Sequence, residues 1–277
     1  MRRETFHTPV DLTLDLRVPS GEIEVVAVEG TETTVELDAS GWTIGAGQFE
    51  DVQTLVDAAR IELRQRGDGH EVIVDVPHKR RGLGLIFDRL NFRLRVTAPH
   101  DANVEISTSS ADIDLRGRLG SLKAQAASGD LRAEELNGRV DIKSASGDVD
   151  VQTIGDNASV ATASGDIFVR VVHGEATLRS ASGDVVVEEA ADSLTVQTAS
   201  GDHRIGAVTA GRIALTSASG DQQIGIRAGA RVHLDVKTMS GDASSELDVG
   251  DAPAVGDGPM VDVRATSMSG DIRITRA

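Results

Sequence analysis

The chain has 277 residues, of which 39% are hydrophobic but only 2% aromatic, with five Phe, one Trp and no Tyr. Its formal net charge of −16 repels phosphate backbones, and the absence of cysteine excludes disulfides and thiolate metal sites. We therefore expect no nucleic-acid partner, and a core of Val, Ile, Leu and Ala suits a narrow, flat interior.

The first nine residues include two arginines, but no apolar run of signal-peptide length follows them. Nowhere do 18 apolar residues follow one another, so the sequence encodes no transmembrane segment. On these grounds the protein is expected to be soluble and cytoplasmic.

Residues 1–100 are predicted to form irregular N-terminal turns. Residues 12–18 and 23–26 alternate apolar and polar side chains on either side of a Pro-Ser-Gly-Glu turn, as strands with one buried face do. Apolar residues at helical spacing then predict an amphipathic helix over about 49–63. We expect this helix to cap the open first turn, and strands to resume at 71–76 and 92–97.

The segment 78–90 interrupts this strand pattern and is basic and apolar in an acidic chain. One hypothesis is a contact for a protein or a membrane surface, because cations followed by apolar residues suit either. The alternative is a loop that folds its apolar residues over the first turns. The candidate interaction residues are Lys79, Arg80, Arg81, Leu85, Ile86 and Phe87.

Residues 101–277 repeat a Ser-x-Asp motif nine times, beginning with a degenerate copy at Ser110-Ala111-Asp112. The steps between the serines are 18, 18, 18, 18, 18, 19, 21 and 29 residues. A fixed period indicates stacked copies of one supersecondary unit, none of which buries its apolar face alone. The later aspartates are Asp130, Asp148, Asp166, Asp184, Asp202, Asp221, Asp242 and Asp271.

Each copy contains two short runs with period-two alternation, separated by a second turn. In the copy that starts at Ser146, the apolar positions are Val149 and Val151, then Ala158 and Val160. This pattern predicts strand, turn, strand and Ser-Gly-Asp turn, with each strand pairing in parallel with its equivalent one turn later. We predict an all-β fold: a single-stranded β-solenoid (β-helix) with about 18 residues per turn, wound right-handed as parallel crossovers usually are.

One domain is expected over residues 1–277, with an insertion at about 247–260. The last run, Ile272 to Thr275, has no evident cap. We expect this terminal edge to be covered by the insertion or by another molecule.

The aspartates would stack one per turn, which places like charges about 5 Å apart and costs roughly 1 kcal/mol per neighbouring pair in water. In the structural interpretation each carboxylate accepts a hydrogen bond from turn backbone. In the alternative, calcium ions lie between the turns, but calcium-binding rolls need a Gly-Gly-x-Gly-x-Asp motif that this chain lacks. We favour the structural interpretation and predict no metal and no cofactor.

No catalytic constellation emerges from the sequence. Seven histidines are scattered without metal-ligand spacing, and His173 and His203 are expected to face solvent beside the repeat turns. No serine lies in a strained elbow with His and Asp neighbours. We therefore predict that the protein is not an enzyme.

Three phrases carry a resemblance to a known family: the repeated Ser-Ala-Ser-Gly-Asp-Val-x-Val, the Pro19-Ser20-Gly21-Glu22 start and the ending from Met268 to Ile274. They resemble the bacterial putative-adhesin family of β-strand-repeat proteins, including domains in Gram-positive envelope-stress proteins of the Lia type. The likeness covers nearly the whole chain. It implies a β-solenoid and cell-envelope association, and it supplies no catalytic residues.

The predicted function is a non-enzymatic scaffold or interaction module, linked to envelope stress or adhesion, whose partner is an unknown protein or envelope component. One alternative is a self-assembling structural protein whose terminal turns pair end to end. The other is a carbohydrate-active β-helix enzyme, which would need a groove of clustered, perturbed carboxylates.

Overall fold

The computed structural model describes residues 1–9, 11–42, 52–77, 89–247 and 258–277. Two compact units can be distinguished, unit 1 over residues 1–137 and unit 2 over residues 138–277, and each is described by itself. The elements of unit 1 are β1 (Arg2–His7), β2 (Leu12–Val28), β3 (Glu32–Trp42), α1 (Val52–Ala58), β4 (Arg60–Arg66), β5 (Gly69–Asp75), β6 (Arg89–Pro99), β7 (Asn103–Leu119), β8 (Leu122–Ala126) and β9 (Leu131–Leu136).

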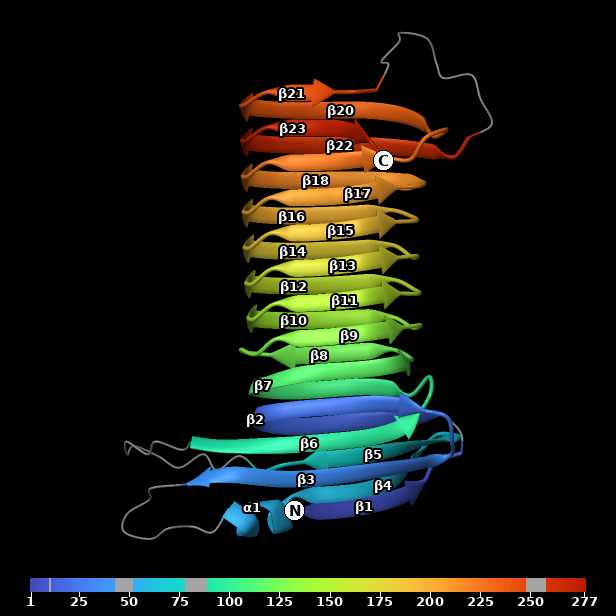
Figure 1. Ribbon diagram of the computed structural model, residues 1–277, viewed down its shortest axis with the longest axis vertical. Helices are drawn as coiled ribbons and strands as arrows, with labels where there is room; N and C mark the ends of the chain where they lie inside the picture. Colours follow the sequence, from blue (N-terminus) through green and yellow to red (C-terminus); the bar gives the residue numbers. More distant parts are fainter. Residues whose placement is uncertain (10, 43–51, 78–88, 248–257) are drawn as a thin grey trace. The chain divides into compact units, whose positions relative to one another are not determined.

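Unit 1 is built around two long strands, β2 and β7, which pair in parallel and contribute to two sheets. In one sheet β2 pairs with β5, and β5 pairs antiparallel with β4. In the other, β2 pairs with β6, β6 pairs antiparallel with β3, and β3 pairs antiparallel with β1. Parallel stacking thus gives way to antiparallel strands at the N-terminal side of both sheets (Figure 1).

The predicted helix over 49–63 is shorter in the structure. The helix α1 ends at Ala58, and residues 60–66 form β4 instead. Residues 60–66 alternate charged side chains with Ile61 and Leu63, which is a strand pattern, and β5 offers a free edge for it to pair with. The cap therefore combines a short helix, with Leu55, Val56 and Ala59 buried, and antiparallel strands.

Unit 2 is a regular parallel stack. Its strands are β10 (Val140–Ser146), β11 (Val149–Ile154), β12 (Ala158–Ser164), β13 (Ile167–Val172), β14 (Ala176–Ser182), β15 (Val185–Ala190), β16 (Leu194–Ser200), β17 (His203–Val208), β18 (Gly211–Ser219), β19 (Gln222–Ile226), β20 (Arg231–Ser240), β21 (Ala243–Ser245), β22 (Met260–Ser269) and β23 (Ile272–Arg276).

Strands of equal position in successive copies pair in register, as the repeat predicts, with one irregularity between Ile205 and Val208 where β17 pairs with β19. Val149 pairs with Ile167, and Ile167 with Val185. Because side chains alternate between faces, this register stacks the predicted apolar positions in columns between the two sheets. The buried hydrophobic side chains of unit 2 are all Val, Ile, Leu and Ala, so the prediction of a core built from these residues is confirmed there.

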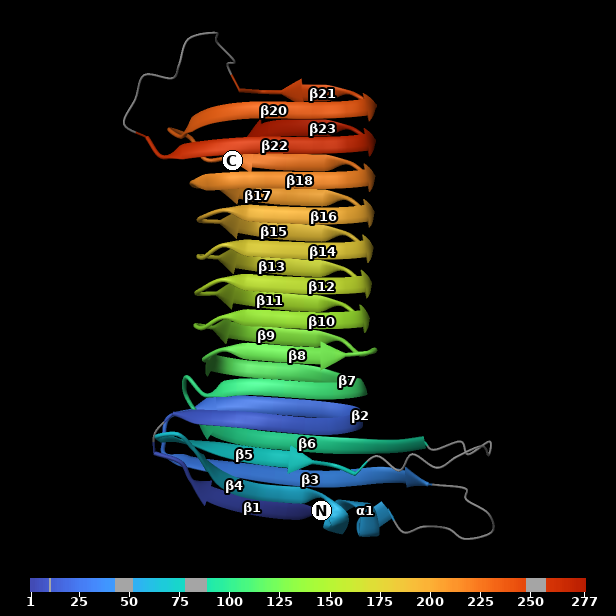
Figure 2. The ribbon, with the colours of Figure 1, turned by 180° about the vertical axis from the view of Figure 1, so that it is seen from behind.

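The last copies are not stacked in chain order. The strand β22 pairs with β18 on one side and with β20 on the other, and β23 likewise lies between β19 and β21. Figure 2 shows the same order from behind. The prediction that the run from Ile272 forms the terminal edge is therefore wrong, because the chain runs through β20 and β21 first and then returns to fill the gap. Of the predicted insertion at 247–260, residues 248–257 lie outside the described residues.

Glycine is required at the Ser-Gly-Asp corners because the stacked backbones approach each other closely there. At Gly201 φ is +147°, and a Cβ would lie 2.1 Å from the carbonyl oxygen of Gly183 in the preceding turn. Only a residue without a side chain fits such a position.

The predicted fold class, an all-β solenoid with a short N-terminal capping helix, is confirmed. The only helix among the described residues, α1, has seven residues, and no described helix is long and apolar enough to cross a membrane.

Candidate functional site

The turn aspartates form a ladder of hydrogen bonds, which we call the aspartate ladder. The backbone N–H of Asp202 donates to Oδ1 of Asp184 at 2.8 Å, and that of Asp221 donates to Oδ1 of Asp202 at 2.8 Å. The same bond joins Asp130 to Asp112 in unit 1. In unit 2 it also joins Asp166 to Asp148, Asp184 to Asp166, Asp271 to Asp221 and Asp242 to Asp271.

These bonds agree with the structural interpretation, in which each carboxylate accepts a hydrogen bond from turn backbone. A carboxylate that accepts a charge-assisted bond from backbone N–H gains stabilisation that offsets the repulsion between stacked charges. Among the described residues, no group of three or more His, Asp or Glu side chains is arranged to hold a metal ion. The aspartate ladder is thus part of the scaffold of each turn.

Replacing Asp184 by alanine is expected to lower the free energy of unfolding by about 1 kcal/mol, because the N–H of Asp202 loses its acceptor. Asp184→Asn keeps an oxygen in place and removes one stacked charge, so it is expected to stay within about 0.5 kcal/mol of the native chain. Urea unfolding of both variants, with and without added calcium, tests this. Equal losses in the two variants, or stabilisation by calcium, would contradict it.

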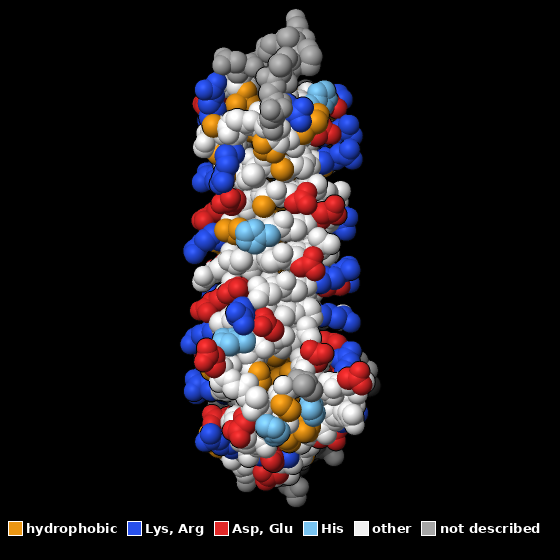
Figure 3. Space-filling model, turned by 90° about the vertical axis from the view of Figure 1, so that its right-hand side faces the viewer, with side chains coloured by type: hydrophobic (Ala, Val, Ile, Leu, Met, Phe, Trp, Pro, Cys, Tyr) orange, Lys and Arg blue, Asp and Glu red, His pale blue; other side chains and the backbone are white. Residues whose placement is uncertain are grey.

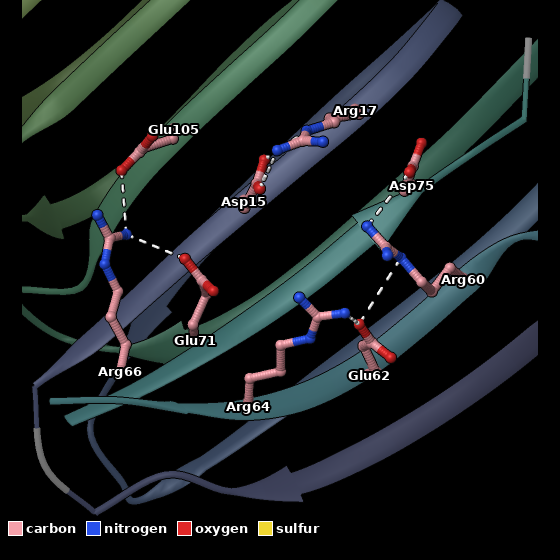
Figure 4. Close-up of polar contacts among 9 residues, drawn as sticks. All are labelled: Asp15, Arg17, Arg60, Glu62, Arg64, Arg66, Glu71, Asp75 and Glu105. Atoms are coloured by element: carbon pink, nitrogen blue, oxygen red, sulfur yellow. Dashed lines mark hydrogen bonds and ion pairs between the residues drawn. The ribbon is translucent and has the colours of Figure 1, made fainter. Parts of the chain in front are cut away.

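A network of charged side chains covers the outer side of the sheet formed by β4, β5, β2 and β7, which we call the charged face. Alternate residues of these strands point outward, and nine of them are charged (Figure 4). They are Asp15, Arg17, Arg60, Glu62, Arg64, Arg66, Glu71, Asp75 and Glu105.

Ion pairs across the strands fix the side chains of the charged face. Arg66 contacts Glu71 at 3.0 Å and Glu105 at 3.1 Å, although Glu105 lies two strands away from Glu71 on β7. Hydrogen bonding to Glu105 raises the pKa of Arg66 above its ordinary value. Arg60 contacts Glu62 at 3.7 Å and Asp75 at 3.4 Å, so one arginine again joins two carboxylates.

A shallow hollow of about 640 Å³ lies in unit 1 where β2 and β7 turn the corner between the sheets. The strand β6 does not turn there but continues along β3, whose Trp42 pairs with Arg89 in the backbone register. Two of the charged groups in the hollow form ion pairs, since Glu22 contacts Arg93 at 3.3 Å and Asp114 contacts Arg116 at 2.5 Å. It is lined by Ser20, Gly21, Glu22, Asn91, Ser110, Asp112, Ile113, Asp114 and Arg132.

The prediction that His203 faces solvent is wrong. His203 begins β17 in the inward column, between Val185 and Gln222, and is 1% exposed. Its Nε2 lies 2.8 Å from Oγ1 of Thr198, whereas its Nδ1 is buried without a hydrogen-bond partner. Burial lowers the pKa of His203 to about 4, against a smaller opposing effect of Asp202. His173, in contrast, is exposed beside its turn.

The structure thus leaves some predicted residues untested and adds others. The six candidate interaction residues between Lys79 and Phe87 lie outside the described residues. Sequence reasoning missed the charged face, because the helix predicted over 49–63 covers the first half of β4 and with it Arg60 and Glu62. It also missed the buried position of His203, although counting from each Ser-Gly-Asp turn would have placed this residue in the inward column.

Unit 2 shows a different surface from the charged face of unit 1. Figure 3 views it from the side at which β11, β13, β15 and β17 end. In the upper part of the figure, acidic and basic side chains project along both flanks of unit 2. Hydrophobic side chains lie over the last strands of this unit.

The Toastrack DUF4097 family model matches residues 59–275. None of the curated proteins matches the chain. Several solved structures do, at low identity and similarity. Crystal structures of putative adhesins from Bacteroides fragilis and Parabacteroides distasonis are 13% and 12% identical, with TM-scores of 0.45 and 0.46. Each match covers 96% of the adhesin, and 99% and 98% of this chain, respectively.

A structure described as a putative lipid binding protein from Parabacteroides distasonis is also similar. It is 12% identical, with a TM-score of 0.42, and the match covers 99% of this chain and 96% of that one.

Proposed function

The chain belongs to the Toastrack DUF4097 family, and we propose that this member is a non-enzymatic interaction module that presents a rigid strand face to a protein partner. The contact is the charged face of unit 1. The observation that carries the proposal is the fixed arrangement of its nine charged side chains. Because strand register and ion pairs hold them in place, little side-chain entropy remains to be lost when a partner docks.

Two arginines on β4 are exposed enough to reach a partner. Arg64 and Arg66 have side chains 51% and 52% exposed, although Arg64 contacts Glu62 and Arg66 bridges two glutamates. Arginine also forms bidentate bonds with carboxylates, which gives such a surface orientation as well as affinity. A partner that presents acidic groups opposite the arginines and basic groups opposite the carboxylates would fit this face.

Among the described residues, two carboxyl groups have shifted pKa values, and both shifts are downward. Those of Asp38 and Asp235 are lowered, by hydrogen bonds from the N-terminal amine and from Lys237, respectively. A general acid in a carbohydrate-active site needs a raised carboxyl pKa.

The double variant Arg64→Glu and Arg66→Glu is expected to lose partner capture while keeping its fold. Reversing the charge of two arginines in a charge-paired interface should weaken binding at least about tenfold. The measurement is affinity capture from native lysate followed by titration of the captured protein. Circular dichroism and thermal melting report the fold.

The matched control is Arg170→Glu with Arg212→Glu, which makes the same charge change on strands of unit 2. Arg170 and Arg212 also form ion pairs, with Glu188 and Asp262. Equal loss in both double variants would show a general charge effect and remove the charged face from the proposal. A captured envelope component would support the association that the resemblance to Lia-type proteins implies.

A further inference from the structure

The outermost strands of unit 2 leave a sheet edge unpaired. The strand β20 pairs with β22 on one side, and no described strand pairs with its other side. An edge of free N–H and C=O groups is a template for another strand. The aspartate ladder stops here as well: Asp242 donates its N–H to Asp271, and no described N–H donates to its own carboxylate.

The core is open at this edge. Val232, Leu234 and Val236 of β20 are partly exposed, whereas their register partners on β22, which are Val261, Val263 and Ala265, are 0% exposed. The large exposed hydrophobic side chains described in unit 2 all lie on these two strands: Met239, Met260 and Met268. Met239 and Met268 lie at one end of these two strands and Met260 at the other. Exposed apolar side chains on an outermost layer are typical of an interface.

The charges on β20 are self-complementary about Val236. Asp235 and Lys237 flank it and share the outward face, since Val232, Leu234 and Val236 occupy the inward column. If two copies of β20 lie antiparallel with Val236 opposite Val236, each Asp235 lies opposite Lys237 of the other copy. Opposite charges facing each other across antiparallel strands stabilise the pairing.

We propose that β20 is the dimerisation edge of this protein, pairing antiparallel with β20 of a second copy about Val236. The pairing closes both exposed edges at once, because a twofold axis gives each copy the same contact. It covers the half-exposed apolar residues of each copy and forms two intermolecular Asp235–Lys237 pairs. The strand that pairs with this edge is β20 of a second copy, because the charges on β20 are complementary to those of another β20 that lies antiparallel to it.

The test is sedimentation velocity of the full chain across a dilution series. The native chain is expected to form a dimer that dissociates on dilution. Asp235→Lys and Lys237→Asp each place two like-charge pairs at the contact, so each is expected to dimerise at least about tenfold more weakly. An equimolar mixture of the two variants restores both opposite-charge pairs and is expected to form heterodimers.

Within one chain Asp235 already contacts Lys237 at 2.9 Å and Arg264 at 3.4 Å, so a single variant also loses these ion pairs. The mixture keeps the test valid, because both variants lose the pair within the chain but only the mixture restores opposite charges across the contact. The matched control is Lys143→Asp on β10, where Asp141 and Lys143 flank Ile142 in the same pattern on a strand that is paired with β12. It is expected to leave dimerisation unchanged. A native chain that is monomeric throughout, or a mixture that stays monomeric, would overturn the proposal.

Discussion

Replacing Gly201 by alanine is expected to destabilise unit 2 by at least about 3 kcal/mol. Two costs combine at this corner. The φ of +147° is unfavourable for any residue with a side chain, and the added Cβ would lie 2.1 Å from the oxygen of Gly183 and 2.7 Å from its carbonyl carbon. Neither of these atoms can move aside, because the backbone of Gly183 is itself held in the stack by the hydrogen bond from its N–H to the carbonyl of Ser200.

Urea unfolding followed by far-ultraviolet circular dichroism measures this loss. The control is Gly229→Ala, also in unit 2, where φ is +88° and no atom lies within 4 Å of the added Cβ. That change meets only the conformational cost, about 1 kcal/mol. If the two variants were equally stable, close stacking at the Ser-Gly-Asp corner would not be what requires glycine there.

Acidification is expected to destabilise unit 2 through His203. Its pKa is lowered to about 4 in the folded protein, against 6.5 for an ordinary histidine. Above pH 6.5 the histidine is neutral in both states and has no effect. As the pH falls from 6.5 towards 4, the unfolded chain binds the proton first, so the folded state loses roughly 3 kcal/mol over this window.

The variant His203→Val isolates this contribution, because Val185 already occupies the same column one turn earlier. We expect the native chain and His203→Val to diverge as the pH falls from 7 to 4, with the variant retaining more of its stability. Urea midpoints across this pH series give the difference. His173→Val, at an exposed turn, is the control and should follow the native chain. A parallel loss in His203→Val would assign acid sensitivity to other groups.

The repeat made most of unit 2 predictable. Each copy places its residues in the same surroundings as the copy before it, so one correct assignment of inward positions such as Val149 and Val151 extends along the stack. The same logic covers His203, whose place in the inward column follows from its distance to the preceding turn. Its place beside a repeat turn led instead to the expectation that it faces solvent.

The remaining differences arise where long-range pairing decides between local alternatives. Residues 55, 56, 59 and 63 fit a helix, but residues 60–66 also alternate, and the free edge of β5 selects the strand. The charged face depends on that pairing, so its nine residues could not be grouped from their spacing. Likewise, a step of 29 residues indicates an insertion but does not reveal that β22 returns to lie between β18 and β20.

This return has a consequence for how the protein folds. During synthesis β20 emerges before β22, and both carry apolar residues that fit the same edge of β18. In the native stack, Val261 and Val263 of β22 pair with Gly211 and Ile213 of β18. Val232 and Leu234 are the equivalent residues of β20, because they pair with Val261 and Val263 on the other side of β22. Until β22 is available, β20 can bind β18 itself and close the stack one layer early. Reaching the native order then requires one strand to displace another, so the final layers are a point of kinetic competition within the chain.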